Sequence, residues 1–87
     1  MVILMEIKSI IYTKHFEDDI KSIKDNGLKI KAKKQIEKII KIPDVGKPLR
    51  YALKGERTVY LKPFRIIYTI DGENLIFLRF EHRDDVY

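Results

Sequence analysis

The side chains that could carry chemistry gather in the last third of the chain. Arg65, Arg79 and Arg83 place three guanidinium groups on strand-like segments, and His82 lies beside the last of them. A guanidinium stays charged and donates hydrogen bonds in a planar fork that matches a phosphate or a carboxylate. Histidine is the side chain that exchanges protons near neutral pH most readily. These residue types could therefore bind a phosphate group and move a proton beside it.

Each of these side chains also has a purely structural interpretation. Arg65 can pair with Glu81 across a sheet, and Arg83 can pair with the two aspartates that follow it. His82 can satisfy a backbone group at the end of a strand. The residue types alone leave both interpretations open.

The overall charge favours a phosphate-rich partner. The chain has 87 residues, with 18 lysines and arginines against 13 acidic residues, for a formal net charge of +5. Such an excess draws a protein towards nucleic acid, although it can also simply keep a small protein soluble. Seven lysines fall between Lys21 and Lys38, among them Lys33 and Lys34. This lysine-rich segment is either a surface that tracks phosphates or an ordinary solvated helix face.

Two helices are predicted upstream of the arginines. An apolar stripe with spacings of four, four and three indicates a first helix, for which Thr13 is a good N-cap. The segment 25–27 ends that helix, with Gly27 available for a left-handed cap. A second helix is predicted from 28 to 41, so that the two form a helical hairpin, and a strand is predicted over residues 3–11 before them. The stripe consists of Tyr12, Phe16, Ile20 and Ile23.

Three strands are predicted after a loop over residues 42–50. They span 58–61, 64–70 and 75–80, and Asp71-Gly72 is a strong hairpin signal between the last two. The side expected to meet the helices carries Phe64, Ile66, Tyr68 and Ile70, with Ile76, Leu78 and Phe80 if the turn has an odd length. The opposite, wetter side then carries Arg65, Arg79, Glu81 and Arg83. The predicted fold class is α+β: an N-terminal strand, a helical hairpin and a three-stranded antiparallel meander, with the helices on one face of the sheet.

Length and composition exclude several classes of protein. A chain of 87 residues is expected to form one domain over 1–87. It has no cysteine, so disulfides and thiolate metal sites are excluded, and two histidines make a structural zinc site a poor fit. No metal or cofactor is predicted. The short apolar start suits neither a secretory signal nor a membrane span, so we expect a cytoplasmic protein; Met5 is an alternative start to Met1.

The last half of the chain resembles a known family. It reads GKPLRYALKGER at 46–57 and FRIIY at 64–68, followed by a DG hairpin, an apolar strand and the ending HRDDVY at 82–87. This combination resembles the RelE branch of the RelE/ParE toxin superfamily, and the likeness extends over nearly the whole chain. It implies a toxin that cuts mRNA in the ribosomal A site without a metal. It also implies attack by a 2′-hydroxyl on the adjacent phosphate, which leaves a 2′,3′-cyclic phosphate and a 5′-hydroxyl.

The resemblance assigns roles to individual residues. Arg65 matches the family's arginine in an aromatic-Arg-x-x-Tyr run, and Arg83 and Tyr87 belong to the C-terminal motif. These three are the implied catalytic residues, with the guanidiniums beside the developing charge and Tyr87 stacked on a splayed base. His82 is the candidate general base. The residues expected to contact mRNA or ribosomal RNA are Lys33, Lys34, Lys54, Arg57, Lys62 and Arg79.

Two departures from the family pattern concern the implied catalytic residues, and the first leaves the general base open. Bacterial RelE carries two lysines on the strand before the aromatic-Arg run, where this chain offers Thr58 and Tyr60. Arg57 and Lys62 flank that strand and could replace the lysines by charge. The family arginine six residues before the terminal tyrosine falls on Glu81 here.

The resemblance also implies partners and leaves two other functions open. A RelB-like antitoxin, partly disordered alone, is expected to lay a helix on the free side of the sheet, in a heteromeric complex for which a heterotetramer is one arrangement. The ribosome and mRNA are the other expected partners, and no membrane is involved. The alternative functions are a ParE-like gyrase poison and a basic RNA- or protein-binding module with weak or no catalysis.

Overall fold

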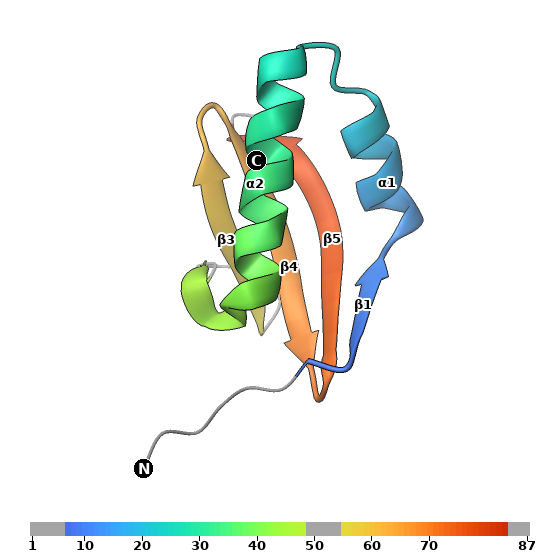
Figure 1. The fold of residues 1–87 in the computed structure, drawn as a ribbon, viewed down its shortest axis with the longest axis vertical. Helices are drawn as coiled ribbons and strands as arrows, with labels where there is room; N and C mark the ends of the chain where they lie inside the picture. Colours follow the sequence, from blue (N-terminus) through green and yellow to red (C-terminus); the bar gives the residue numbers. More distant parts are fainter. Residues whose placement is uncertain (1–6, 49–54, 84–87) are drawn as a thin grey trace.

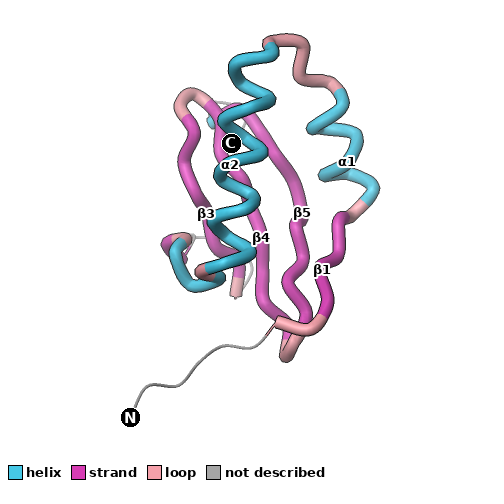
Figure 2. Tube along the Cα trace, viewed as in Figure 1, coloured by secondary structure: helices cyan, strands magenta, loops and turns pink. Residues whose placement is uncertain are grey.

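The fold is a five-stranded sheet with two helices on one side (Figure 1). The computed structural model describes residues 7–48 and 55–83. The elements are β1 (Ser9–Tyr12), α1 (Lys14–Lys21), α2 (Asn26–Lys41), a 3-10 turn η1 (Pro43–Val45), β2 (Lys47–Pro48), β3 (Glu56–Leu61), β4 (Phe64–Asp71) and β5 (Asn74–His82). Figure 2 shows how the helices and the meander follow each other along the chain.

The sheet is mixed, with the strand order β1-β5-β4-β3-β2. The edge strand β1 runs parallel to β5, and the other neighbours are antiparallel. The predicted α+β architecture is thus confirmed, including the three-stranded meander. The short strand β2 was not predicted, because its two residues, Lys47 and Pro48, lie in a segment that turn residues dominate.

The first helix begins at the predicted cap and is fixed to β5. The Phe16 backbone N–H donates to Thr13 Oγ1 at 3.0 Å, and the phenyl ring is 2% exposed. One turn later Asp19 Oδ2 accepts a hydrogen bond from the backbone N–H of Phe80 at 2.9 Å. Helix α1 is therefore held against β5 by a buried ring and by a side-chain-to-backbone hydrogen bond.

The second helix begins earlier than predicted. Asp25 is its N-cap, and Asp25 Oδ1 accepts from the backbone N–H groups of Gly27 at 2.8 Å and Leu28 at 3.2 Å. Gly27 lies in the first turn of α2, so the expectation that it forms a left-handed cap of α1 is wrong. The physical reason is that an aspartate satisfies the free N–H groups at the start of a helix better than a glycine ends the previous one.

The hairpin between β4 and β5 corrects the predicted core. Asp71 pairs with Asn74, so the turn contains two residues rather than an odd number. Leu75 and Phe77 consequently face the helices, each 0% exposed, instead of the expected Ile76 and Leu78. Further along, the register shifts at Ile67/Tyr68, whose partners are Arg79 and Phe77. The extra residue of this β-bulge is Leu78, and it returns Phe80 to the core as predicted.

Tyr68 joins the core to the loop after α2. Its ring is 0% exposed, and its Oη donates to the Pro43 carbonyl at 2.6 Å and accepts from the Gly46 N–H at 2.8 Å. A Cβ on Gly46 would lie 2.6 Å from that Oη, so only glycine fits there. Burial raises the pKa of Tyr68 above 10.0. Tyr68 is thus a core residue, as the pattern indicated.

Candidate functional site

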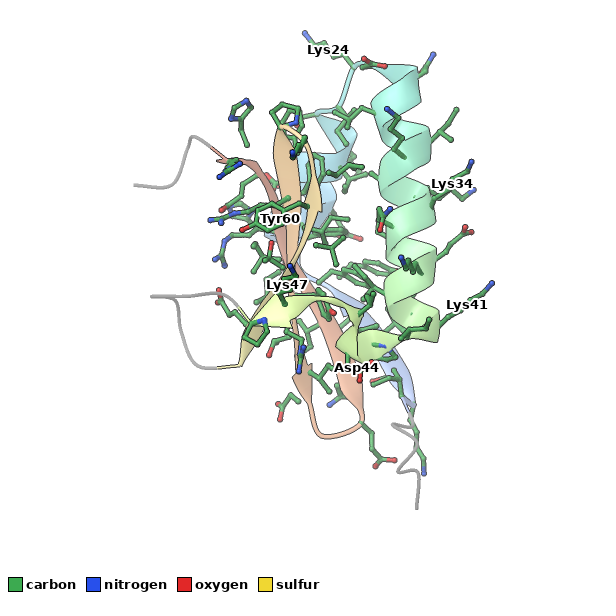
Figure 3. The ribbon with its side chains drawn as sticks, turned by 90° about the vertical axis from the view of Figure 1, so that its left-hand side faces the viewer. Lys24, Lys34, Lys41, Asp44, Lys47 and Tyr60 are labelled. Carbon is green, nitrogen blue, oxygen red and sulfur yellow. The ribbon has the colours of Figure 1, made fainter. Side chains whose placement is uncertain are left out.

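The chemistry-bearing side chains lie on the side of the sheet opposite the helices. We call this side the arginine face. It consists of Glu56, Thr58 and Tyr60 on β3, Arg65 and Ile67 on β4, and Arg79, Glu81 and Arg83 on and after β5. In Figure 3 the side chain of Tyr60 points away from α2, on which Lys34 and Lys41 point the other way. Ile67 and Thr58 form the floor of the arginine face, at 0% and 3% exposure.

A chain of ion pairs crosses this face over three strands. Arg65 donates to Glu81 Oε2 from Nε at 2.8 Å and from Nη2 at 2.6 Å. Arg79 donates from Nε to the other oxygen of Glu81 at 3.1 Å, and from Nη2 to Glu56 Oε1 at 2.9 Å. Following the contacts, the order is therefore Arg65, Glu81, Arg79, Glu56, on strands β4, β5, β5 and β3. The hydrogen bond that Arg79 donates to Glu56 is the main cause that raises the pKa of Arg79, against the opposing effect of burial.

These contacts decide how available each arginine is. Arg65 lies on the predicted side of the sheet, but it is 8% exposed rather than solvated, because it is enclosed with Glu81. Arg79 is shared between two carboxylates. Both guanidiniums are therefore held in fixed positions with their charges balanced by acidic groups.

One corner of the arginine face presents exposed cations next to an aromatic ring. Arg83 is exposed, and its guanidinium carbon lies 5.9 Å from the centroid of the Tyr60 ring. The Arg83 backbone N–H donates to the Pro63 carbonyl at 2.8 Å, which keeps Arg83 beside the turn between β3 and β4. Lys62 is exposed in that same turn. Tyr60 pairs directly with Arg65 in the sheet register, so this corner continues the ion-pair chain.

His82 lies on the other side of the sheet. It pairs with Phe64, and the two rings meet edge-on with centroids 5.2 Å apart. Together with Phe80 and the connection between the helices, His82 lines a cavity of about 570 Å³. Alternation along β5 sets the imidazole on the side of Phe80 and opposite to Glu81, so the structure does not bring His82 together with the arginines.

The remaining predicted contact residues are distributed widely. Arg57 Nη1 donates to the Gly46 carbonyl at 2.6 Å, so this guanidinium anchors the loop after α2. Lys33 and Lys34 are exposed on α2, and Figure 3 shows Lys34 pointing away from the side of the sheet that carries Tyr60. Lys54 and Tyr87 lie outside the described residues.

Comparison with known proteins decides the family. A family model described as "ParE toxin of type II toxin-antitoxin system, parDE" matches residues 10–87. The chain belongs to the RelE/ParE superfamily of type II toxins. The family model carries the ParE name, whereas the similar proteins described below carry Rel names.

The similar proteins support the same family. Over 45 residues the toxin is 42% identical to "Toxin RelG" of Mycobacterium tuberculosis, a match that spans 49% of this chain and about half, 52%, of RelG. This chain also resembles a chain in the crystal structure of the toxin–antitoxin complex RelBE2 of Mycobacterium tuberculosis, with a TM-score of 0.71 and 25% sequence identity. The match covers 92% of this chain and 95% of that chain. A chain of the RelB–RelE complex of Methanococcus jannaschii matches with a TM-score of 0.72 at 20% identity. That match covers 88% of this chain and 94% of the other, and it shows that the fold is shared.

Sequence reasoning missed two features of this toxin's arginine face. Tyr60 was considered only as a replacement for a family lysine, and the Glu56–Arg79 bridge was not foreseen. The alternation of Glu56, Thr58 and Tyr60 along β3 was the signal that could have placed all three on one face. Of these three, Thr58 has a buried Oγ1 with no hydrogen-bond partner among residues 7–48 and 55–83.

Residues 7–48 and 55–83 contain no group of three or more histidine, cysteine, aspartate or glutamate side chains that could hold a metal ion. In the same ranges, no helix has the length and apolar character needed to cross a membrane.

Proposed function

We propose that this toxin cuts RNA, and that its substrate is mRNA held by the ribosome. The observation that carries the proposal is the exposed corner of the arginine face, where Arg83 lies over Tyr60 with Lys62 close by. Exposed cations next to an exposed aromatic ring match the phosphates and the bases of a single strand. The resemblance to RelE-like toxins supports the same substrate.

The proposed reaction is an internal transfer at one phosphate. The 2′-oxygen forms a bond to phosphorus while the bond to the 5′-oxygen breaks, which leaves a 2′,3′-cyclic phosphate and a 5′-hydroxyl. A base removes the proton from the 2′-hydroxyl, and the departing 5′-oxygen gains one. Positive charge fixed beside the phosphate oxygens stabilises the transition state, where negative charge accumulates.

The arrangement of the arginines suggests distinct roles. Arg83 is exposed and can pair with the phosphate oxygens directly. Arg65 is enclosed with Glu81 and can reach a phosphate only by exchanging that carboxylate for it. Tyr87 is proposed to stack on a base, as the family resemblance implies. His82 stays a candidate for proton transfer, although it lies on the side of the sheet opposite to Glu81.

The lysine-rich helix supports ribosomal docking. The exposed Lys33 and Lys34 on α2 give the toxin a second cationic surface, where Lys34 points away from the arginine face (Figure 3). A particle made largely of RNA presents phosphates on several sides of any protein bound within it. The lysines could therefore contact ribosomal RNA while the arginine face holds mRNA.

A protein antitoxin is the proposed second partner. The structures similar to this toxin include the RelBE2 complex and the RelB–RelE complex described above. We propose that a RelB-like antitoxin binds this toxin in a heteromeric complex and prevents RNA from reaching the arginine face. A basic toxin with a formal net charge of +5 would attract an acidic segment for this purpose.

Cell-free translation tests the proposed activity. Adding the toxin should stop protein synthesis and produce new 5′-hydroxyl ends within ribosome-bound message. Arg83→Ala should lower the cutting rate on the order of 100-fold, the usual cost of losing one group that stabilises the transition-state charge. Lys14→Ala is the matched control, because Lys14 is exposed on α1 and pairs with Asp18 at 3.7 Å, away from the arginine face.

A second candidate function is poisoning of DNA gyrase, which the ParE family match favours. This function predicts trapped gyrase–DNA cleavage complexes and intact message. Arrest of translation with uncut mRNA, or RNA binding without cutting, would reject the nuclease proposal. The second of these results would instead support a basic binding module.

A further inference from the structure

Tyr60 is a large aromatic side chain exposed at one corner of the arginine face. Its neighbours on the same side of β3, Glu56 and Thr58, are buried at 9% and 3% exposure, whereas Tyr60 is 48% exposed. The ring points away from the helices (Figure 3) and pairs in register with Arg65. An exposed ring of this size beside a guanidinium offers a flat surface on which a planar ligand can stack.

The exposed Tyr12 gives a useful comparison. Tyr12 is 43% exposed, but its ring stacks on Phe77 with centroids 5.3 Å apart and planes 8° apart. Its exposed part is the rim of the hydrophobic core. Tyr60 instead has a guanidinium over its ring, from Arg83 at 5.9 Å. The two tyrosines are therefore similarly exposed but have different neighbours, one apolar and one cationic.

The neighbours of Tyr60 indicate the chemistry of its ligand. Arg65 and Arg79 are balanced by Glu81 and Glu56, so neither is readily available to an incoming anion. The exposed cations in this corner are Arg83 and Lys62. A ligand that fits must combine a flat ring with anionic groups on both sides of it, and a nucleotide within a single strand has this form.

We propose that Tyr60 is a stacking platform for one nucleobase of single-stranded RNA, with Arg83 and Lys62 holding the phosphates that flank this base. The base covers the part of the ring that Arg83 leaves exposed. Arg83 approaches from the same side of the sheet, so one nucleotide can contact the ring and the guanidinium together. This inference rests on the proposed function in that RNA is taken as the target, but it concerns binding and needs no cleavage.

The ion-pair chain has a role in this arrangement. Tyr60 is next to Arg65 across the sheet, and Arg65 is fixed by two hydrogen bonds to Glu81. The platform is therefore bordered by side chains that are already held in place. A platform of this kind loses little conformational entropy when a base stacks on it.

The test measures the affinity for a short single-stranded RNA carrying 2′-O-methyl groups, which cannot be cut by 2′-hydroxyl attack. Fluorescence anisotropy gives the affinity of the wild type, Tyr60→Trp and Tyr60→Leu. We expect Tyr60→Trp to bind like the wild type and Tyr60→Leu to bind on the order of 10-fold more weakly, as for other bases stacked on aromatic side chains. Tyr12→Leu is the matched control and should bind RNA like the wild type, with thermal melts confirming that each variant is folded.

A set of RNAs with one abasic position each makes the test specific for stacking. At one position, removing the base should weaken RNA binding by the wild type about as much as the Tyr60→Leu substitution does. The same abasic RNA should bind the Tyr60→Leu variant as tightly as the intact RNA does. Arg83→Ala should keep this abasic effect but reduce the slope of log affinity against log salt by about 0.7 for the lost phosphate contact.

The outcomes separate this inference from the proposed function. If Tyr60→Leu binds every RNA like the wild type, or if abasic positions weaken both proteins equally, the ring does not stack on a base and the inference is overturned. Neither result contradicts the proposed RNA cleavage, which the translation assay tests separately. If the wild type binds no RNA, alone or on ribosomes, both the inference and the nuclease proposal fail.

Discussion

Replacement of Glu81 by alanine tests whether the ion-pair chain stabilises the sheet. The Glu81 carboxylate accepts hydrogen bonds from both Arg65 and Arg79. Arg65 has a side chain that is only 9% exposed, so little water can replace the lost carboxylate. Arg79 keeps its contact with Glu56 at 2.9 Å. The loss of folding stability in Glu81→Ala should therefore come mainly from the nearly buried guanidinium of Arg65, which has lost its partner.

The size of the effect follows from the burial of the pair. Removing one member of a fully buried ion pair costs about 3–5 kcal/mol. The Glu81 side chain is 20% exposed, so some water enters the site and we expect a loss of about 2–3 kcal/mol. For a domain of this size each kcal/mol lowers Tm by about 4–8 °C, so Tm should fall by roughly 10–20 °C.

Chemical and thermal unfolding followed by circular dichroism measures this loss. Glu73→Ala is the matched control, because Glu73 pairs with Lys8 at 3.1 Å while both side chains are more than half exposed, at 59% and 64%. An exposed pair contributes about 0–1 kcal/mol. Arg65→Met combined with Glu81→Leu should recover most of the stability, because an apolar pair can replace a buried ion pair. Equal losses for Glu81→Ala and Glu73→Ala would refute the reasoning.

Two further predictions concern the contact between Tyr68 and the loop after α2. Gly46→Ala should lower the free energy of unfolding by about 1–3 kcal/mol in urea titrations, because the new methyl group overlaps the Tyr68 hydroxyl, and an unchanged stability would mean that the loop moves away freely. Tyr68→Phe should cost about 1–3 kcal/mol near neutral pH, because it leaves the Pro43 carbonyl and the Gly46 N–H without their partner. Burial raises the pKa of Tyr68 above 10.0, so the folded state favours the protonated phenol, and the associated stability is present below pH 10.0 and lost as pH rises through the raised pKa. The difference in stability between the wild type and Tyr68→Phe should therefore shrink above pH 10.0, and a constant difference would contradict the burial of a titrating phenol.

The order of elements could be predicted because local signals agreed with the tertiary fold. The helical spacing after Thr13 and the Asp71-Gly72 turn both correspond to structure found in the chain. The start of α2 could not be predicted with the same certainty, because Asp25 and Gly27 are competing signals for the end of one helix and the start of the next. The strand β2 has two residues, and its pairing with Arg57 and Thr58 depends on contacts distant in sequence.

The composition of the site was predicted better than its contacts. Alternation placed Arg65, Arg79 and Glu81 on one side of the sheet, and the register confirms it. The same alternation puts His82 on the other side, which could have been read from the sequence. The Arg65–Glu81 pair is the structural interpretation that the sequence offers, and it is confirmed. The Arg79–Glu56 contact instead depends on the registers of two hairpins together, because these residues lie on β5 and β3, which do not pair with each other. That information is tertiary, and a pattern within one strand does not contain it.

The β-bulge at Leu78 connects the core to the arginine face. Before the bulge, Phe77 faces the helices, so strict alternation would also turn Arg79 and Glu81 towards them. The extra residue reverses the alternation, and β5 can contribute to the core at both ends while Arg79 and Glu81 join Arg65.

The start of α1 satisfies the backbone at this bulge. Thr13 Oγ1 donates to the Leu78 carbonyl at 2.8 Å, and the Thr13 backbone N–H donates to the Phe77 carbonyl at 3.1 Å. A bulge leaves backbone groups without their ladder partners, and an unpaired buried carbonyl is costly. The same threonine therefore caps α1 and stabilises the irregular strand. The position of the arginine cluster thus depends on a helix cap on the opposite side of the sheet, and not only on the strands that carry the arginines.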